Sequence, residues 1–293
     1  MSQTKPTVAI AGAGNVGRAV GRALAEAGYP IAAVMCRTRG SAEAAARFIG
    51  AGRAVENPAE AGAADLVLIG APDRAIAEVC ERIAREGGFR PRAVVMHFSG
   101  ALSSKALCSA AKRGARVASL HPLQSFPSPE QGVERLPGTV FTFEGDEEAE
   151  ETARMVVADL GGETIRVKAE AKPLYHAACC VISNYAAAVA DLGFDLMARA
   201  GIAREHAQRA AMPLLKGTVA NIERIGLPAA LTGPIDRGDA ATVEAHLEAM
   251  EGLPEDAREL YRALGRRALM MAQEKRAMDP DAAAALARLL GEQ

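Results

Sequence analysis

Short apolar runs alternate with amphipathic segments rich in Ala, Glu and Arg along the first half of the chain. This alternation is typical of repeated β-α-β units. The runs are continuously apolar, which predicts parallel strands covered on both faces of a sheet. We expect strands at Thr7–Ala11, Ile31–Cys36, Asp65–Gly70, Ala93–Phe98, Arg116–Leu120, Thr139–Glu144 and Thr164–Val167. We expect helices between them at Gly17–Ala27, Ser41–Phe48, Ala75–Arg85, Ser103–Ala111 and Glu147–Leu160.

The strand pattern stops near Lys168, and helical periodicity fills the rest of the chain. Gly and Pro separate helices that are expected at Pro173–Ala200, Arg204–Ile225, Ala240–Glu251, Pro254–Lys275 and Pro280–Leu290. The pattern predicts an α/β fold class, a doubly wound domain followed by an all-α domain. We place the first domain at residues 1–168 and the second, expected to bind substrate and form a homodimer, at residues 169–293.

One stretch of the second domain, Leu174–Ala190, contains no Asp, Glu, Lys or Arg and approaches the length of a membrane span. It is rich in Ala and carries several polar residues, His176, Ser183 and Asn184 among them. We therefore expect a buried helix and no membrane contact.

Composition sets the broad class of the protein. The chain has 293 residues, 49% of them apolar and 24% charged, so it can bury the cores of two domains. Its 34 basic and 36 acidic residues are mixed, which argues against nucleic acid as a partner. The start of the chain runs from Lys5 and Pro6 straight into a strand without a cleavable leader, so we expect a cytoplasmic protein. The five cysteines are odd in number and form no C-x-x-C pair, so neither a disulfide framework nor a metal site is expected.

A glycine-rich turn follows the first strand directly and opens the first helix. Gly12, Gly14 and Gly17 form the pattern G-x-G-x-x-G. The first glycine permits the tight turn, the second lets the backbone approach a pyrophosphate, and the third lets the helix pack on the strand. We expect this turn, with Asn15 and Val16, to place a dinucleotide at the helix N-terminus, as in a Rossmann domain. A plain turn without a ligand is the alternative.

The end of the second strand indicates which dinucleotide is bound. NAD enzymes usually place Asp or Glu there, to bond the ribose 2′-hydroxyl. This chain has Arg37 and Thr38 instead, which would hold a 2′-phosphate by charge-assisted hydrogen bonds. We therefore expect NADP as the cofactor, with NAD as the alternative if Arg37 is only a solvated loop residue.

Ligands of a doubly wound sheet bind beyond the carboxyl ends of its strands. Gly70 and Ala71 stand at one of these ends, where small residues suit a backbone that runs past a cofactor, and we include Ala71 and Pro72 in the cofactor site. Asp73, which comes next, is expected to be the N-cap of the following helix.

Two histidines, His97 and His121, stand at the ends of two other strands, with Ser99 close to the first. Histidine exchanges a proton near neutral pH, as reduction of a carbonyl or imine requires. We expect His121 to be the catalytic proton donor or acceptor, Ser99 to orient it or the substrate, and His97 to bind substrate. For either histidine, structural hydrogen bonding is the alternative.

The first helix of the second half carries polar residues on one stripe. At 3.6 residues per turn, Lys172, His176, Cys180, Ser183 and Asn184 share a face. Polar groups on an apolar helix need partners, which a cleft for cofactor and substrate would supply. We expect His176 to be a catalytic residue and Ser183 and Asn184 to bind substrate. Hydrogen bonding between packed helices is the alternative.

Four segments together resemble a known family. They are Val8–Gly17, Ser119–Phe126, Tyr175–Tyr185 and Leu231–Asp239. Over nearly its whole length the chain resembles Rossmann-like NADP or deazaflavin-dependent oxidoreductases whose C-terminal half is a domain of unknown function. The wider superfamily includes 6-phosphogluconate dehydrogenases, ketopantoate reductases and pyrroline-5-carboxylate reductases. The resemblance implies a Rossmann domain with an all-helical second domain that often dimerises.

A partial likeness to prephenate dehydrogenases concerns two strand ends. In that family a Ser after the fifth strand and a His-Pro after the sixth flank the nicotinamide and the substrate hydroxyl, and Ser99 and His121-Pro122 occupy matching places. The Gly-rich continuation of that family is missing here. In hydroxyacid dehydrogenases of the superfamily a Lys and an Asn act from the next helix, and His176 lies near the place of that Lys.

These observations predict an NADP-dependent oxidoreductase that acts on a small, carboxylate-bearing substrate. An NADP-binding sensor or assembly protein without chemistry is the alternative from another class. A deazaflavin-linked oxidoreductase is a third.

Overall fold

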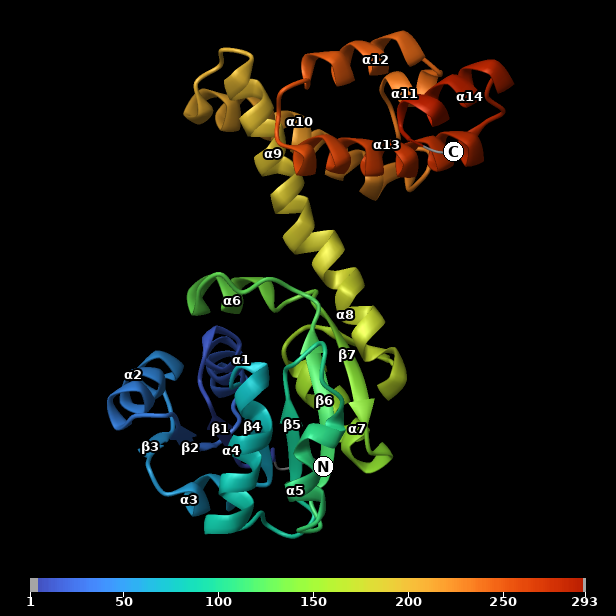
Figure 1. The fold of residues 1–293 in the computed structure, drawn as a ribbon. Coiled ribbons are helices and arrows are strands. Elements are labelled where there is room, and N and C mark those ends of the chain that lie inside the picture. The colour runs from blue at the N-terminus through green and yellow to red at the C-terminus, as the bar shows by residue number, and fades with distance from the viewer. Residues whose placement is uncertain (1–4, 292–293) are drawn as a thin grey trace. The chain divides into compact units, whose positions relative to one another are not determined.

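The computed structural model describes residues 5–291 and divides into two compact units, the first ending at Tyr185 and the second beginning at Ala186 (Figure 1). The predicted class, an α/β domain followed by helices, is confirmed. The boundary that we place at residue 168 lies just after the last strand, and it remains a prediction about domains.

Within the described residues, the strands of the first unit form one sheet in the order β3-β2-β1-β4-β5-β6-β7-β8. The strands are β1 (Val8–Ala11), β2 (Ile31–Met35), β3 (Arg53–Val55), β4 (Leu66–Ile69), β5 (Val94–His97), β6 (Arg116–Pro122), β7 (Val140–Gly145) and β8 (Glu163–Arg166). Neighbours are parallel, except that β7 runs antiparallel to β6.

Helices cover both faces of this sheet. They are α1 (Asn15–Glu26), α2 (Arg39–Ile49), α3 (Pro58–Gly62), α4 (Asp73–Glu86), η1 (Ser104–Leu107), α5 (Cys108–Ala111), α6 (Pro129–Arg135) and α7 (Glu147–Asp159). Val8 and Ile10 of β1 join a core with α1, α2 and α7, whereas Ala9 and Ala11 join a second core with α3, α4 and α5. Burial on both faces explains why these strands are continuously apolar.

Two features of the sheet differ from the sequence prediction. β3 was not expected, because three residues at the edge of the sheet are too few for a recognisable apolar run. The expectation of parallel strands is wrong at β7, whose Phe141 and Phe143 are buried like residues of a parallel strand. Apolar continuity reports burial on two faces and carries no information on strand direction.

The second unit is helical in its described part. Its helices are α9 (Ala186–Arg199), α10 (Arg204–Ile225), α11 (Pro234–Arg237), α12 (Ala240–Ala249), α13 (Glu255–Lys275) and α14 (Pro280–Leu289). α10 has the predicted bounds. A small core joins α12, α13 and α14 through Val243, Leu247, Leu269, Leu286 and Leu290.

The helix that we expect at Pro173–Ala200 begins as α8 (Lys172–Cys180), passes through one π-helical turn, η3 (Val181–Tyr185), and continues as α9. The expectation of a buried helix is wrong for the single chain, because Leu174 and Ile182 are each 78% exposed. By length and composition alone, the stretch Ala169–Arg199 also qualifies as a membrane span, and none of its most apolar window is buried. The lack of charge in Leu174–Ala190 therefore does not arise from burial within the single chain.

Candidate cofactor and active site

The glycine turn brings the ends of β1 and β4 into contact. Gly12 has a φ of +82°, which favours glycine, and a Cβ there would lie 2.7 Å from the backbone N of Ala71. A Cβ on buried Gly17 would lie 2.9 Å from the carbonyl oxygen of Gly12. Ala71 and Pro72 follow β4 beside this turn, so the structure brings these predicted cofactor residues together.

The N-terminus of α1 suits a pyrophosphate. Gly14 is the N-cap and supplies no side chain, and the first turn contains no acidic residue. Its N–H groups lack partners within the helix and carry the positive end of the helix dipole. The side chain of Val16 is partly buried and packs against the core. The amide of Asn15 donates to the carbonyl oxygens of Phe126, at 2.9 Å, and Pro127, at 3.2 Å, so this side chain ties the turn to the loop after β6.

The end of β2 fits a phosphate group. Arg37 is exposed, and no ion pair engages it within residues 5–291. Thr38 is the N-cap of α2, where its Oγ1 accepts from the N–H of Ser41. The first turn of α2 has no acidic residue, so no carboxylate there would repel a 2′-phosphate.

Ser99 holds the loop after β5. Its hydroxyl donates to Asp73 Oδ2 over 2.8 Å and accepts from the N–H groups of Ala101 and Leu102, at 3.2 and 2.9 Å. The expected N-cap role of Asp73 is wrong, because Pro72 is the N-cap of α4 and the carboxylate binds Ser99 instead. We therefore read Ser99 as a positioning residue.

His97 lies below the site and is fully buried. Its Nδ1 accepts from the N–H of Ser99 and its Nε2 donates to the carbonyl oxygen of Ser103, each over 3.1 Å. Burial lowers the pKa of His97 to about 4, so the ring is neutral at pH 7. Both ring nitrogens are engaged, so this geometry favours the structural alternative over substrate contact.

His121 lies inside β6, which ends at Pro122, two residues beyond the strand end that the sequence predicts. Its Nδ1 is 2.7 Å from the hydroxyl of Tyr175 on α8. Burial raises the pKa of Tyr175 to about 12, so this hydroxyl keeps its proton at pH 7, and we assign it as the donor to Nδ1. Burial, followed by the charge of Lys172, lowers the pKa of His121 to about 4. The ring is therefore neutral at pH 7, and its proton is on Nε2.

Gly100 lies against both His121 and His176. A Cβ on Gly100 would be 2.9 Å from Nε2 of His121 and 2.6 Å from Cδ2 of His176. The two rings are 6.2 Å apart between centroids, at an angle of 73°. The Sγ atom of Cys180 lies 3.9 Å from Nδ1 of His176. The structure thus unites His121, His176 and the loop of Ser99, three of the predicted catalytic elements.

Lys172 is a residue of the site to which we gave no role from the sequence. It is fully buried, and its Nζ donates to Ser119 Oγ over 2.6 Å and to the Ser99 carbonyl oxygen over 3.1 Å. Burial lowers the pKa of Lys172 to about 8, while Glu144 and Asp73 oppose this shift. A lone lysine at the start of a long uncharged segment was the available signal. Tyr175, three residues further on, was visible only as part of a motif.

Ser183 and Asn184 lie in the π-helical turn, where both are exposed. A π turn contains more residues than an α turn, so it shifts the phase of the following side chains. The stripe that we predict from a period of 3.6 residues therefore holds from Lys172 to Cys180 and breaks at η3. Substrate contact by Ser183 and Asn184 remains a prediction.

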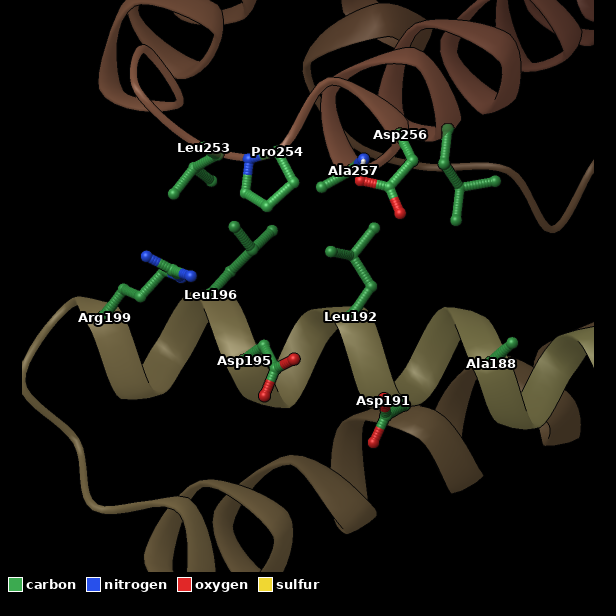
Figure 2. Close-up of a pocket in the computed structure, with 11 residues that line it drawn as sticks. Ala188, Asp191, Leu192, Asp195, Leu196, Arg199, Leu253, Pro254, Asp256 and Ala257 are labelled. Carbon is green, nitrogen blue, oxygen red and sulfur yellow. Dashed lines mark hydrogen bonds between the residues drawn. The ribbon is translucent and has the colours of Figure 1, made fainter.

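The second unit contains a separate cavity of about 240 Å³ between α9 and the start of α13 (Figure 2). Asp191, Asp195 and Arg199 line it from α9, and Asp256 lines it from α13. Arg204 forms ion pairs with the first two aspartates. None of the predicted site residues lines this cavity.

Two family models match the chain, one in its N-terminal part and one in its C-terminal part. The fold and its glycine turn define a protein of the Rossmann-like class, and residues 1–122 match the Rossmann-like domain. Residues 139–268 match DUF2520, a domain of unknown function. The chain therefore combines a Rossmann-like domain with a DUF2520 domain, as the resemblance predicts. No curated protein sequence matches the chain.

Several solved structures share the fold. A protein from Thermotoga maritima is 27% identical with a TM-score of 0.74, and the match covers 92% of this chain and 99% of that one. A Bacteroides fragilis protein described as a candidate NADP oxidoreductase is 22% identical with a TM-score of 0.72, over 91% and 99% of the two chains. A reductive aminase from Aspergillus terreus, solved with NADPH and ethyl levulinate, is 18% identical with a TM-score of 0.64, over 97% and 99%. At the last two identities the likeness concerns the fold.

Proposed function

We propose that the protein is an NADP-dependent oxidoreductase that acts on a small, carboxylate-bearing substrate. The observation that carries this proposal is the placement of His121, bonded to Tyr175, on a strand of the sheet whose first turn is built for a dinucleotide. The names of the Bacteroides and Aspergillus proteins support NADP as the cofactor.

Chain residues would hold the cofactor at three places. The backbone of the glycine turn, from Gly12 to Gly17, would bind the pyrophosphate at the start of α1. Arg37 and the N-terminus of α2 would bind the 2′-phosphate. Ala71 and Pro72 would flank the cofactor beyond β4. When bound, the nicotinamide supplies or accepts a hydride.

The reacting group of the substrate would be handled by side chains from β6 and α8. Tyr175 fixes the tautomer of His121, so that Nε2 presents a hydrogen to the substrate. His176 would contact the substrate from α8, since its ring lies next to that of His121 and both rings face Gly100. Ser99 and Lys172 hold the intervening loop in place.

We further propose that the protein is a cytoplasmic homodimer formed through its helical part. α9 has no buried residue, and α10 buries only Ala207. Apolar side chains of α10 remain exposed, with Leu214 at 75% and Val219 at 58%. A second copy of the chain would cover this surface.

Two measurements test the proposed activity. Calorimetry with NADPH tests the cofactor site, and an absorbance screen of NADPH oxidation with 2-oxo acids, imines and cyclic ketones tests for chemistry. Binding without turnover would favour the NADP-dependent sensor. Absence of binding would contradict the proposal, and a copurified deazaflavin would identify the third alternative.

A further inference from the structure

Two imidazole rings face Gly100. His121 and His176 both approach the position that a Cβ on this residue would occupy. The tautomer of His121 leaves an N–H at Nε2, and the phenol of Tyr175 supports that tautomer from behind. A neutral N–H polarises an oxygen atom by hydrogen bonding without bringing a formal charge of its own.

The carboxylates near the site are already engaged. Asp73 accepts the hydroxyl of Ser99. Glu144 is buried, and its two oxygens accept from the N–H of Ser104, at 2.6 Å, and from its hydroxyl, at 2.8 Å. Accepting these hydrogen bonds leaves both carboxylates negatively charged, but the three atoms nearest to a Cβ on Gly100 belong to His121 and His176.

The ammonium group of Lys172 supplies positive charge beneath this loop. It donates to the carbonyl oxygen of Ser99, the residue before Gly100. Burial is the largest cause of the lowered pKa of His121, and the charge of Lys172 then lowers this pKa by more than the charge of Asp73 raises it. The same field that opposes a proton on the imidazole would oppose a cation beside it and stabilise an anion.

We propose that the site is built for a carbonyl and its alcohol, and that Nε2 of His121 receives the carbonyl oxygen as it gains negative charge. This inference rests on the proposed function and deepens it. The sequence is compatible with reduction of either a carbonyl or an imine, and this inference favours the carbonyl.

The step balances with groups already named. With NADPH as the hydride donor, the carbonyl carbon would gain a hydride, and the π pair of the C=O bond would move onto oxygen. The oxygen would take the proton from Nε2 of His121, and water would return a proton to Nε2, so that His121 and Tyr175 end in their starting protonation states. Reduction of a cationic iminium instead removes a positive charge, so the field of Lys172 would weaken binding of that substrate before the step begins.

Binding of three probes that share the same ring and differ in charge tests this proposal. Cyclopentanecarboxylate, cyclopentanol and cyclopentylammonium would be titrated by calorimetry into the protein saturated with NADP⁺ at pH 7. We expect the carboxylate to bind at least tenfold more tightly than the ammonium. Lys172→Met should remove most of that difference, whereas Lys105→Met, at an exposed lysine on η1, should leave it unchanged.

If Lys172→Met fails to fold, a second variant still tests the inference. Glu144→Gln removes a buried negative charge and should increase the preference for the carboxylate. The affinity for NADP⁺ and the melting temperature, measured for each variant, report folding. Tighter or equal binding of the ammonium, binding of no probe, or a preference that no variant alters would overturn the inference while NADP⁺ still binds. Failure to bind NADP⁺ would overturn the proposed function itself, and this inference with it.

Discussion

The hydroxyl of Tyr175 lies 2.7 Å from Nδ1 of His121 and determines which nitrogen of that ring is free to act. Because the phenol donates, Nε2 carries the hydrogen, and Nε2 is the atom that faces Gly100. One residue comes from β6 and the other from α8, so the pair depends on docking of that helix against the sheet. The proposed donor is thus held on two regular elements and on no flexible loop.

The first prediction concerns cofactor choice. We expect NADPH to bind at least tenfold, or about 1.4 kcal/mol, more tightly than NADH in calorimetry. Arg37→Ala should remove most of this preference, because it removes the cation that would face the 2′-phosphate. Arg39→Ala is the matched control, since Arg39 already pairs with Glu43 over 2.9 Å. Equal affinities of the intact protein for the two cofactors would contradict the NADP assignment.

The second prediction concerns the proton donor. His121→Asn should lower turnover by ~10²–10⁴-fold, the usual effect of losing a positioned acid or base, and leave NADPH affinity unchanged. Tyr175→Phe should lower turnover less, because Nε2 remains while its tautomer is no longer fixed. Stopped-flow measurement of NADPH oxidation separates the chemical step from binding. If the His121→Asn enzyme is active and its pH–rate profile is unaltered, His121 is not the proton donor, and His176 becomes the candidate.

The third prediction concerns stability in acid. The pKa of His97 falls from its ordinary value of 6.5 to about 4 in the folded chain. The unfolded chain therefore binds a proton at higher pH than the folded chain, so stability falls as the pH drops from about 6.5 towards 4. Between pH 7 and pH 5 this residue should account for a loss of about 2 kcal/mol.

Urea unfolding of the natural protein and of His97→Gln at both pH values checks this loss. His121 shifts in the same direction and is present in both proteins, so the difference between them isolates His97. We expect the smaller pH dependence in the variant. An identical dependence in both would show that His97 is accessible to protons in the folded state.

The fourth prediction concerns assembly. We expect sedimentation velocity to show a dimer at micromolar concentration, and Leu214→Glu with Val219→Glu to give a monomer, because both side chains lie on the exposed apolar face of α10. Glu223→Gln, on the same helix, serves as a control without an added charge. A monomer of the natural protein at that concentration would end the proposal.

The sequence predicts much of the fold because its signals are local. The glycine turn, the buried strands and the glycines that flank α10 are each local features, and the bounds of α10 were predicted without error. The antiparallel direction of β7 depends instead on its pairing with β6, where Thr142 lies opposite His121. No local sequence pattern indicates this pairing.

The site was harder to predict than the fold. His121 and His176 were identified because histidine is rare in this chain and its chemistry is distinctive. The partners that decide their roles come from far along the chain, 54 residues away for His121 and Tyr175 and 73 for Ser99 and Lys172. The sequence suggested that Ser99 orients a reacting group and that His97 binds substrate, and the hydrogen bonds of the two side chains show that both hold the loop.

The bonds from Asn15 to the backbone of Phe126 and Pro127 have a consequence for the order of binding. They connect the phosphate end of the cofactor site to the loop that begins two residues after His121. If the dinucleotide stabilises this loop, thermodynamic linkage makes the substrate bind more tightly once the dinucleotide is in place. We therefore expect an ordered kinetic mechanism in which the dinucleotide binds first and leaves last, and product-inhibition patterns would reveal a random order if Asn15 does not transmit the effect.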